Sequence, residues 1–268
     1  VFLRGLMFGL LLGLIYSESD NSQKGITERV VCLFFIGMLG GISTMMFLPQ
    51  VFEERAVHYR ELGSSMYHTN SYLCSLILSS TPIILISTLC MTIPAWAISP
   101  MQKDWWHLVY FFGSSTAVSF VPYGVTLLLC SISATADGAN GLVSVVDIIS
   151  TFTAGFLLIP SKIPGYWIWA YWTAYLHFGL EAMFINEFRY ESYGCPGGEG
   201  ALVIPVPGEL DPDRVQLYCP VLTGNQILES LDVNQTWLIP DICILIGCYV
   251  GCLLLTAVCM NKLRHIKR

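Results

Sequence analysis

Charged side chains are scarce in this sequence. Of its 268 residues only 12% are charged, whereas 54% are hydrophobic, and the mean hydropathy is +0.61. A soluble domain normally has about a quarter of its residues charged, which keeps it in solution. This composition excludes an ordinary soluble domain and predicts a chain that lies mostly within a membrane.

Motifs of the common nucleotide-binding and metal-dependent enzymes are lacking as well. The sequence contains no GxxxxGK[ST] phosphate-binding loop and no HExxH zinc motif. Its ten cysteines form no CxxC pair of the kind that holds a metal. We therefore expect no catalytic residue and no metal site in this chain, and nothing in it indicates a nucleic-acid partner.

Long apolar runs are abundant instead. A hydrocarbon core of about 30 Å needs about 20 apolar residues in a helix, because lipid offers the backbone no hydrogen-bond partner. Six runs reach or approach this length, and the first opens the chain without an initiator Met, so we interpret the sequence as beginning inside a span. The runs cover residues 1–16, 30–52, 72–98, 105–134, 141–160 and 237–260. The expected fold class is an all-α integral membrane protein with six transmembrane helices.

Acidic residues gather in the segment 187–236, which we expect to be an extracellular loop. Residues 187–232 hold eight acidic side chains against two arginines, a difference of six that equals the whole net charge of -6. The segment also contains a glycosylation sequon at Asn234, which is usable only on the lumenal side. Cys195 and Cys219 are the only cysteines outside the apolar runs. A disulfide between them would stabilise the fold by about 3 kcal/mol on the chain-entropy model.

The segment 161–186 allows two interpretations. It is apolar enough to be a seventh span, but its first half is crowded with tyrosine and tryptophan, which prefer the headgroup level. His177 and Glu181 would also lie deep in hydrocarbon if it crossed, at a cost of a few kcal/mol. We therefore favour a re-entrant helical hairpin before the last span. Both interpretations place the basic tail after residue 260 in the cytosol, as the positive-inside rule requires.

An amphipathic pattern occupies residues 51–66, between the second and third spans. Phe52, Ala56, Tyr59 and Leu62 recur at spacings of four, three and three, which places them on one face of a helix. Charged residues cover the remaining faces. The pattern predicts a short cytosolic helix, which in the simplest case is only a solvated connector.

Separated stretches of the sequence resemble the membrane domain of the G subfamily of ABC exporters, which includes the pleiotropic drug-resistance and White-type transporters. Residues 54–61 (ERAVHYRE) and 66–67 (MY) are similar to the coupling-helix signature of that family. Residues 155–160 (GFLLIP) and 186–188 (NEF) are similar to its fifth-span exit and re-entrant hairpin. The resemblance covers nearly the whole chain, although the elbow helix and the nucleotide-binding domain are missing at the front.

The resemblance implies a half-transporter membrane domain that pairs with a second membrane domain around a central cavity. ATP and Mg would bind to the missing nucleotide-binding domain, whose closure would push on Glu54 and Arg55 of the coupling helix. Independently of the resemblance, three runs carry glycines at GxxxG spacing, which lets helix backbones approach closely. These glycines are Gly5, Gly9 and Gly13, then Gly37 and Gly41, and finally Gly247 and Gly251.

The resemblance also places the substrate cavity on the second and fifth spans, with an outward gate at Phe156 and Leu157. Asp147 is unusual among these residues, because a carboxylate inside a span costs about 2.5 to 3.5 kcal/mol on insertion scales. It would either recognise a basic or hydroxylated substrate or serve structure by capping a neighbouring helix end. The expected cavity residues are Phe35, Met38, Leu39, Ile42, Met45, Ser144, Asp147, Ile148 and Thr151.

The function implied by the resemblance is that of the membrane half of an ATP-driven exporter. Such a protein moves a lipophilic substrate, such as a lipid, sterol or xenobiotic, by alternating access. We expect a multi-pass integral protein of the plasma membrane. The alternative is a heptahelical ligand-binding receptor without transport. The two differ in the placement of residues 17–26, which lie outside in the exporter and inside in the receptor.

Overall fold

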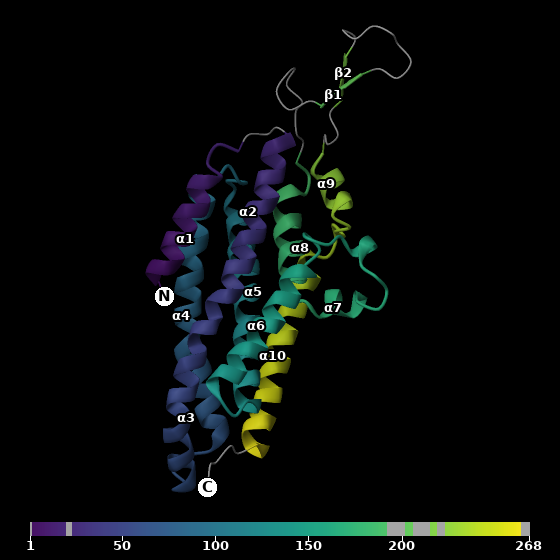
Figure 1. Cartoon of the computed structure of the whole chain (residues 1–268). Helices are drawn as coiled ribbons and strands as arrows, with labels where there is room; N and C mark the ends of the chain where they lie inside the picture. The colour runs from purple at the N-terminus through teal and green to yellow at the C-terminus, as the bar shows by residue number, and fades with distance from the viewer. Residues whose placement is uncertain (1, 20–22, 192–201, 206–214, 219–222, 264–268) are drawn as a thin grey trace.

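The computed structural model describes residues 2–19, 23–191, 202–205, 215–218 and 223–263. Within these residues the chain is a bundle of helices with one small antiparallel hairpin at one end (Figure 1). The hairpin pairs β1 (Leu202–Pro205) with β2 (Val215–Tyr218). The helices are α1 (Phe2–Ile15), α2 (Gln23–Ile42), η1 (Ser43–Met46), α3 (Phe47–Gly63), α4 (Thr69–Ile98), α5 (Trp105–Ile132), α6 (Ala136–Phe152), η2 (Pro160–Lys162), α7 (Ile168–Thr173), α8 (Tyr175–Phe188), α9 (Gly224–Ser230) and α10 (Leu238–Lys262).

Four helical regions in the described residues are long and apolar enough to cross a membrane. They are Lys24–Gly63, in which α2, η1 and α3 follow one another, together with Thr69–Ile98, Trp105–Ile132 and Leu238–Lys262. α1 and α6 have 14 and 17 residues, fewer than the about 20 that a perpendicular span needs. The prediction of a helical membrane protein is confirmed, and four of its expected spans reach full length.

α1 packs closely along α4 through its glycines. A Cβ atom added at Gly9 would lie 2.3 Å from the carbonyl oxygen of Met91, a distance that no side chain tolerates. Gly5 and Gly13 meet other backbone oxygens of α4 in the same way. The first GxxxG run is therefore a contact surface within the chain. Gly37 and Gly41 of α2 likewise face α8, whereas Gly247 and Gly251 of α10 meet no described atom within 4 Å.

α8 lies in the interior of the bundle, and all 14 of its residues are buried. His177 and Glu181 are therefore surrounded by protein, and His177 Nε2 lies 3.5 Å from Glu181 Oε2. α7 stands out at the side of the bundle (Figure 1) and exposes Trp169 and Trp172. Extended backbone at Ala174 separates α7 from α8. The segment 161–186 is thus divided into two helices of 6 and 14 residues.

The amphipathic helix α3 differs from its expected form in bounds and in orientation. It covers Phe47–Gly63, beginning and ending earlier than the expected 51–66. Its buried side chains include Val51 and His58, whereas Ala56, expected on the buried face, is exposed. The buried face is turned because His58 stacks on the ring of Tyr72 in α4, with centroids 4.0 Å apart. His58, a polar residue, is therefore buried at a position where hydropathy alone predicts an apolar residue.

The expected extracellular loop contains more regular structure than its proline and glycine content suggested. α8 extends to Phe188, and β1, β2 and α9 follow before α10. Asn234 is exposed, and its side-chain oxygen accepts hydrogen bonds from the amide and hydroxyl of Thr236. Cys195 and Cys219 lie outside the described residues, so their pairing stays a prediction.

Candidate functional site

α6 has one buried face and one exposed face. Asp147 lies on the buried face, beside Val143 and Ser150. The hydroxyl of Ser144 donates to the carbonyl of Asn140, and Thr151 donates to the carbonyl of Asp147, so both remain within their own helix. The exposed face is an apolar stripe at helical spacing. Its members are Leu142, Val145, Ile148 and Phe152.

The cavity residues expected on the second span also include both packed and exposed side chains. Phe35, Met38 and Leu39 are half-buried and pack against the core that surrounds α8. Met45, in η1, packs against a second core nearer to α3, and Ile42 is exposed. Of the expected cavity positions, Ile42 and Ile148 therefore present apolar surface outward from a single chain.

Asp147 joins α6 to α8. Its Oδ1 accepts a hydrogen bond of 2.9 Å from the hydroxyl of Tyr175, and the residue is only 5% exposed. The Tyr175 hydroxyl in turn lies against Gly41 of α2, where an added Cβ would come within 2.6 Å. Three helices therefore meet at this hydrogen bond. This contact supports the structural role considered for Asp147.

The expected gate lies in the turn that follows α6. Gly155 has a φ of 88°, a left-handed conformation that glycine adopts without strain, and it turns the chain out of the helix. Phe156 then points toward α2, where its ring lies 4.7 Å from the ring of Phe34. Leu157 points away and is 48% exposed. The turn thus presents one residue to the bundle and one to its surface.

Arg55, one of the two expected coupling residues, binds the C-terminal end of α5. Its guanidinium donates to the carbonyl of Ser133 at 2.9 Å and to the carbonyl of Cys130. It also lies 4.4 Å from the ring centre of Phe52. Positive charge is favourable at a helix C-terminus, where the last carbonyls have no helical partner. Arg55 therefore links α3 directly to α5.

Glu54, the other expected coupling residue, lines a hollow of about 520 Å³ between α3 and the start of α4. Its carboxylate accepts a hydrogen bond of 3.0 Å from Gln50. Tyr67, in the connection to α4, donates to Glu61 at 2.8 Å on the rim of the same hollow. Burial and this hydrogen bond raise the pKa of Tyr67 to about 12. The hollow combines acidic and aromatic side chains at the end of the bundle where α3 lies.

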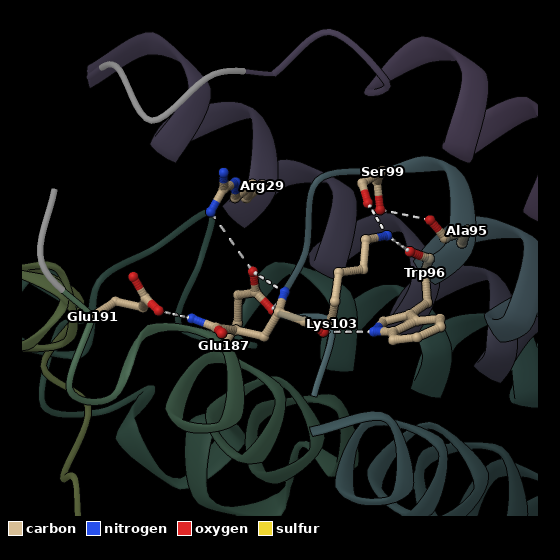
Figure 2. A network of polar contacts seen from close by, with 8 residues as sticks. Arg29, Ala95, Trp96, Ser99, Lys103, Glu187 and Glu191 are labelled. Carbon is tan, nitrogen blue, oxygen red and sulfur yellow. Dashed lines mark hydrogen bonds and ion pairs between the residues drawn. The ribbon is translucent and has the colours of Figure 1, made fainter. Parts of the chain in front are cut away.

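A buried polar network at the opposite end was not expected from the sequence. Glu187, in the last turn of α8, is 4% exposed, although its charge had been counted with the solvated loop. It lies 3.9 Å from Arg29 Nη1 of α2, and both its oxygens accept the backbone amide of Gln102 (Figure 2). Burial raises the pKa of Glu187 to about 7, against the opposing effects of Gln102 and Arg29. The sequence held one clue to this network, because Arg29 and Glu187 carry opposite charges at the ends of two apolar segments.

Comparison with known proteins identifies the family. The model of the ABC-2 type transporter family matches residues 1–188, which is more than half of the chain. The chain therefore belongs to the ABC-2 type transporter family. The predicted likeness to the membrane domain of G-subfamily ABC transporters is confirmed by its relatives, and the chain is accordingly an integral membrane protein.

Three of these relatives show how far the likeness extends. ABC transporter G family member 2 of Dictyostelium discoideum is 29% identical over 271 residues, which cover 98% of this chain and 20% of the relative. ABC transporter G family member 6 of the same organism is 26% identical, covering 91% of this chain and 16% of the relative. ABC transporter G family member 6 of Arabidopsis thaliana is 28% identical, covering 68% of this chain and 25% of the relative. The chain thus spans about a fifth of the length of the first of these relatives.

Proposed function

We propose that this chain is the membrane-spanning half of an ATP-driven exporter for lipophilic substrates. Membership of the ABC-2 type transporter family is the observation that carries the proposal. The contact of Arg55 with the end of α5 supports it, because it ties α3, the helix that carries the expected coupling residues, directly to α5. The alternative of a heptahelical receptor has no support in the comparisons or in the fold.

The proposed topology has six spans, namely α1, α2, α4, α5, α6 and α10. α3 and the C-terminal end of α10 lie at one end of the bundle and α9 at the other (Figure 1), which suits cytosolic and extracellular ends. α7 and α8 form the re-entrant hairpin. Supporting this, α8 has 14 residues, all enclosed by protein, and α7 has 6. Residues 17–19 then lie on the extracellular side, as the exporter requires.

The proposed substrate cavity forms between the exposed stripe of α6 and the same stripe of a second membrane domain. Val145, Ile148 and Phe152 are each more than half exposed in the single chain, and all are apolar. Two such stripes facing each other would enclose an apolar space suited to a lipid, a sterol or a xenobiotic. The second domain is either another copy of the chain or another half of a longer protein.

The proposed energy source is a nucleotide-binding domain that binds ATP and Mg and docks on α3. Its closure would move α3, and Arg55 would carry this movement to α5. The gate at Phe156 and Leu157 would then open outward. We further propose a plasma-membrane location, glycosylation at Asn234 and a disulfide between Cys195 and Cys219. An exposed Asn234 supports the glycosylation.

Replacing Glu54 tests this function in the full-length protein. Glu54→Ala should retain substrate binding but lower ATP-dependent transport and substrate-stimulated ATPase activity, because Glu54 lines the hollow beside α3. Glu53→Ala is the matched control, since Glu53 is its exposed neighbour. Transport is measured in inside-out vesicles with a panel of lipophilic compounds. Equal transport by the two variants would remove Glu54 from coupling, and no ATP-dependent uptake of any compound would contradict the exporter.

A further inference from the structure

The tripeptide Asn186-Glu187-Phe188 ends α8 at the extracellular side, and the proposed mechanism gives it no role. The Asn186 side chain donates a hydrogen bond of 3.0 Å to the carbonyl of His107, in the first turn of α5. The carbonyl of Phe188 lies against Gly224 at the start of α9, where an added Cβ would come within 1.8 Å. Two of the three residues thus join α8 to two other helices.

Glu187 makes the third connection, through a charged side chain that is only 4% exposed. Its carboxylate lies 3.9 Å from Arg29 and accepts the amide of Gln102 at 3.3 and 3.2 Å (Figure 2). Arg29 belongs to α2, and Gln102 belongs to the turn between α4 and α5. We call residues 186–188 with these partners the outer junction. It joins the extracellular ends of α2, α4, α5, α8 and α9.

The turn that carries Gln102 is itself held rigidly. Lys103 donates to the carbonyls of Trp96 and Ser99 at 2.5 and 2.8 Å (Figure 2) and to the carbonyl of Ala97 at 3.1 Å, which occupies the unpaired carbonyls at the end of α4. The indole of Trp96 donates to the carbonyl of Gln102 at 2.7 Å. The amide that Glu187 accepts is therefore presented at a fixed position. A carboxylate bound to it is fixed as well.

The opposite end of α8 begins at Tyr175, which holds Asp147 of α6. The gate turn runs between these two helices, and Phe156 rests on Phe34, a residue of α2. α2 and α8 are thus joined to each other at their outer ends by Glu187, and the gate closes against α2 further inside. The outer junction sets the spacing of the two helices on which the closed gate depends.

We propose that Glu187 is a positioning residue for the outward gate, which keeps Phe156 seated on Phe34 until nucleotide binding moves the helices. This inference rests on the proposed export function. Loss of the Glu187 charge removes the attraction to Arg29 while the turn between α4 and α5 stays intact. α2 and α8 then separate more easily at their outer ends. The gate opens in the absence of ATP.

Thiol labelling of the full-length protein tests the proposal. Leu157→Cys places a reporter on the exposed side of the gate turn, and a membrane-impermeant maleimide measures its accessibility on intact cells depleted of ATP. Adding Glu187→Gln, which is nearly isosteric, should accelerate labelling about tenfold, a shift of about 1.4 kcal/mol in gate opening. Gln102→Ala is the matched control. It removes the side-chain bond to Glu191 but keeps the backbone amide that Glu187 accepts.

The outcomes separate this inference from the export function. Fast labelling in Glu187→Gln with wild-type labelling in Gln102→Ala supports the positioning role, and Arg29→Gln should reproduce the effect without adding to it. Wild-type labelling in a surface-expressed Glu187→Gln protein overturns it. If neither Glu187→Gln nor Arg29→Gln reaches the surface, the junction serves folding and the proposal also fails. Failure of the export function would give a different result. In the protein that carries Leu157→Cys alone, the labelling rate would then be the same with and without ATP.

Discussion

Removing the guanidinium of Arg55 should loosen the C-terminal end of α5. The side chain supplies charged hydrogen bonds to the carbonyls of Cys130 and Ser133 and lies over the ring of Phe52. A hydrogen bond to a charged group contributes about 1.5 to 3 kcal/mol, and a cation over an aromatic ring adds about 0.5 to 1 kcal/mol. Arg55 is half-buried, so water replaces part of these contacts. We expect Arg55→Ala to lower the free energy of opening of the last α5 turn by about 2 to 4 kcal/mol.

Hydrogen exchange measured by mass spectrometry on the full-length protein reads this local stability directly. At about 1.4 kcal/mol per factor of ten, amides of residues 129–133 should exchange about 30- to 700-fold faster in Arg55→Ala than in the unchanged protein. Arg60→Ala is the control, because Arg60 lies on the exposed face of the same helix. Equal exchange in the two variants would refute the reasoning and with it the link between α3 and α5.

Two further substitutions test the packing inside the membrane. Asp147→Asn should change transport of a matched cationic and neutral substrate equally, because Asp147 is bound to Tyr175 on a buried face; a selective loss of the cationic substrate would instead place it in the cavity. Gly9→Val should lower surface expression and thermal stability, since overpacking costs about 1 to 3 kcal/mol and a Cβ there would lie 2.3 Å from a carbonyl of α4. Gly247→Val, with no described atom within 4 Å, should behave like the unchanged protein in the same fluorescent-fusion melting assay. Equal losses in the two valine variants would contradict the α1 and α4 contact.

Hydropathy located the long helices well, because a membrane helix depends on the apolar residues of its own segment and satisfies its backbone hydrogen bonds within it. α4 and α5 occupy Thr69–Ile98 and Trp105–Ile132, within three residues of the expected 72–98 and 105–134. The start of α2 was missed by seven residues, because its first turns carry charges and were placed outside the apolar run. Arg29 belongs to these turns. It is buried there, 3.9 Å from the carboxylate of Glu187.

The orientation of side chains was harder to predict than the helices themselves. Glu187 was counted with solvated acids because its partners, Arg29 and Gln102, are distant in the chain and nothing local reveals them. Asp147 was singled out correctly as an unusual residue. Its partner Tyr175 lies across a helix boundary that the sequence left open. Residue type indicates that a buried charge needs a partner, but only the packed bundle shows which one it has.

We propose that two membrane domains enclose a cavity whose outward gate opens when ATP binds. A spin label at Leu157 in each domain of the full-length transporter, read by double electron–electron resonance, measures the width of that gate. Leu157 is exposed, so the label fits without disturbing the core. We expect a short distance between the two labels without nucleotide and a longer one with ATP bound and hydrolysis blocked. A distance that is the same in both states would contradict it.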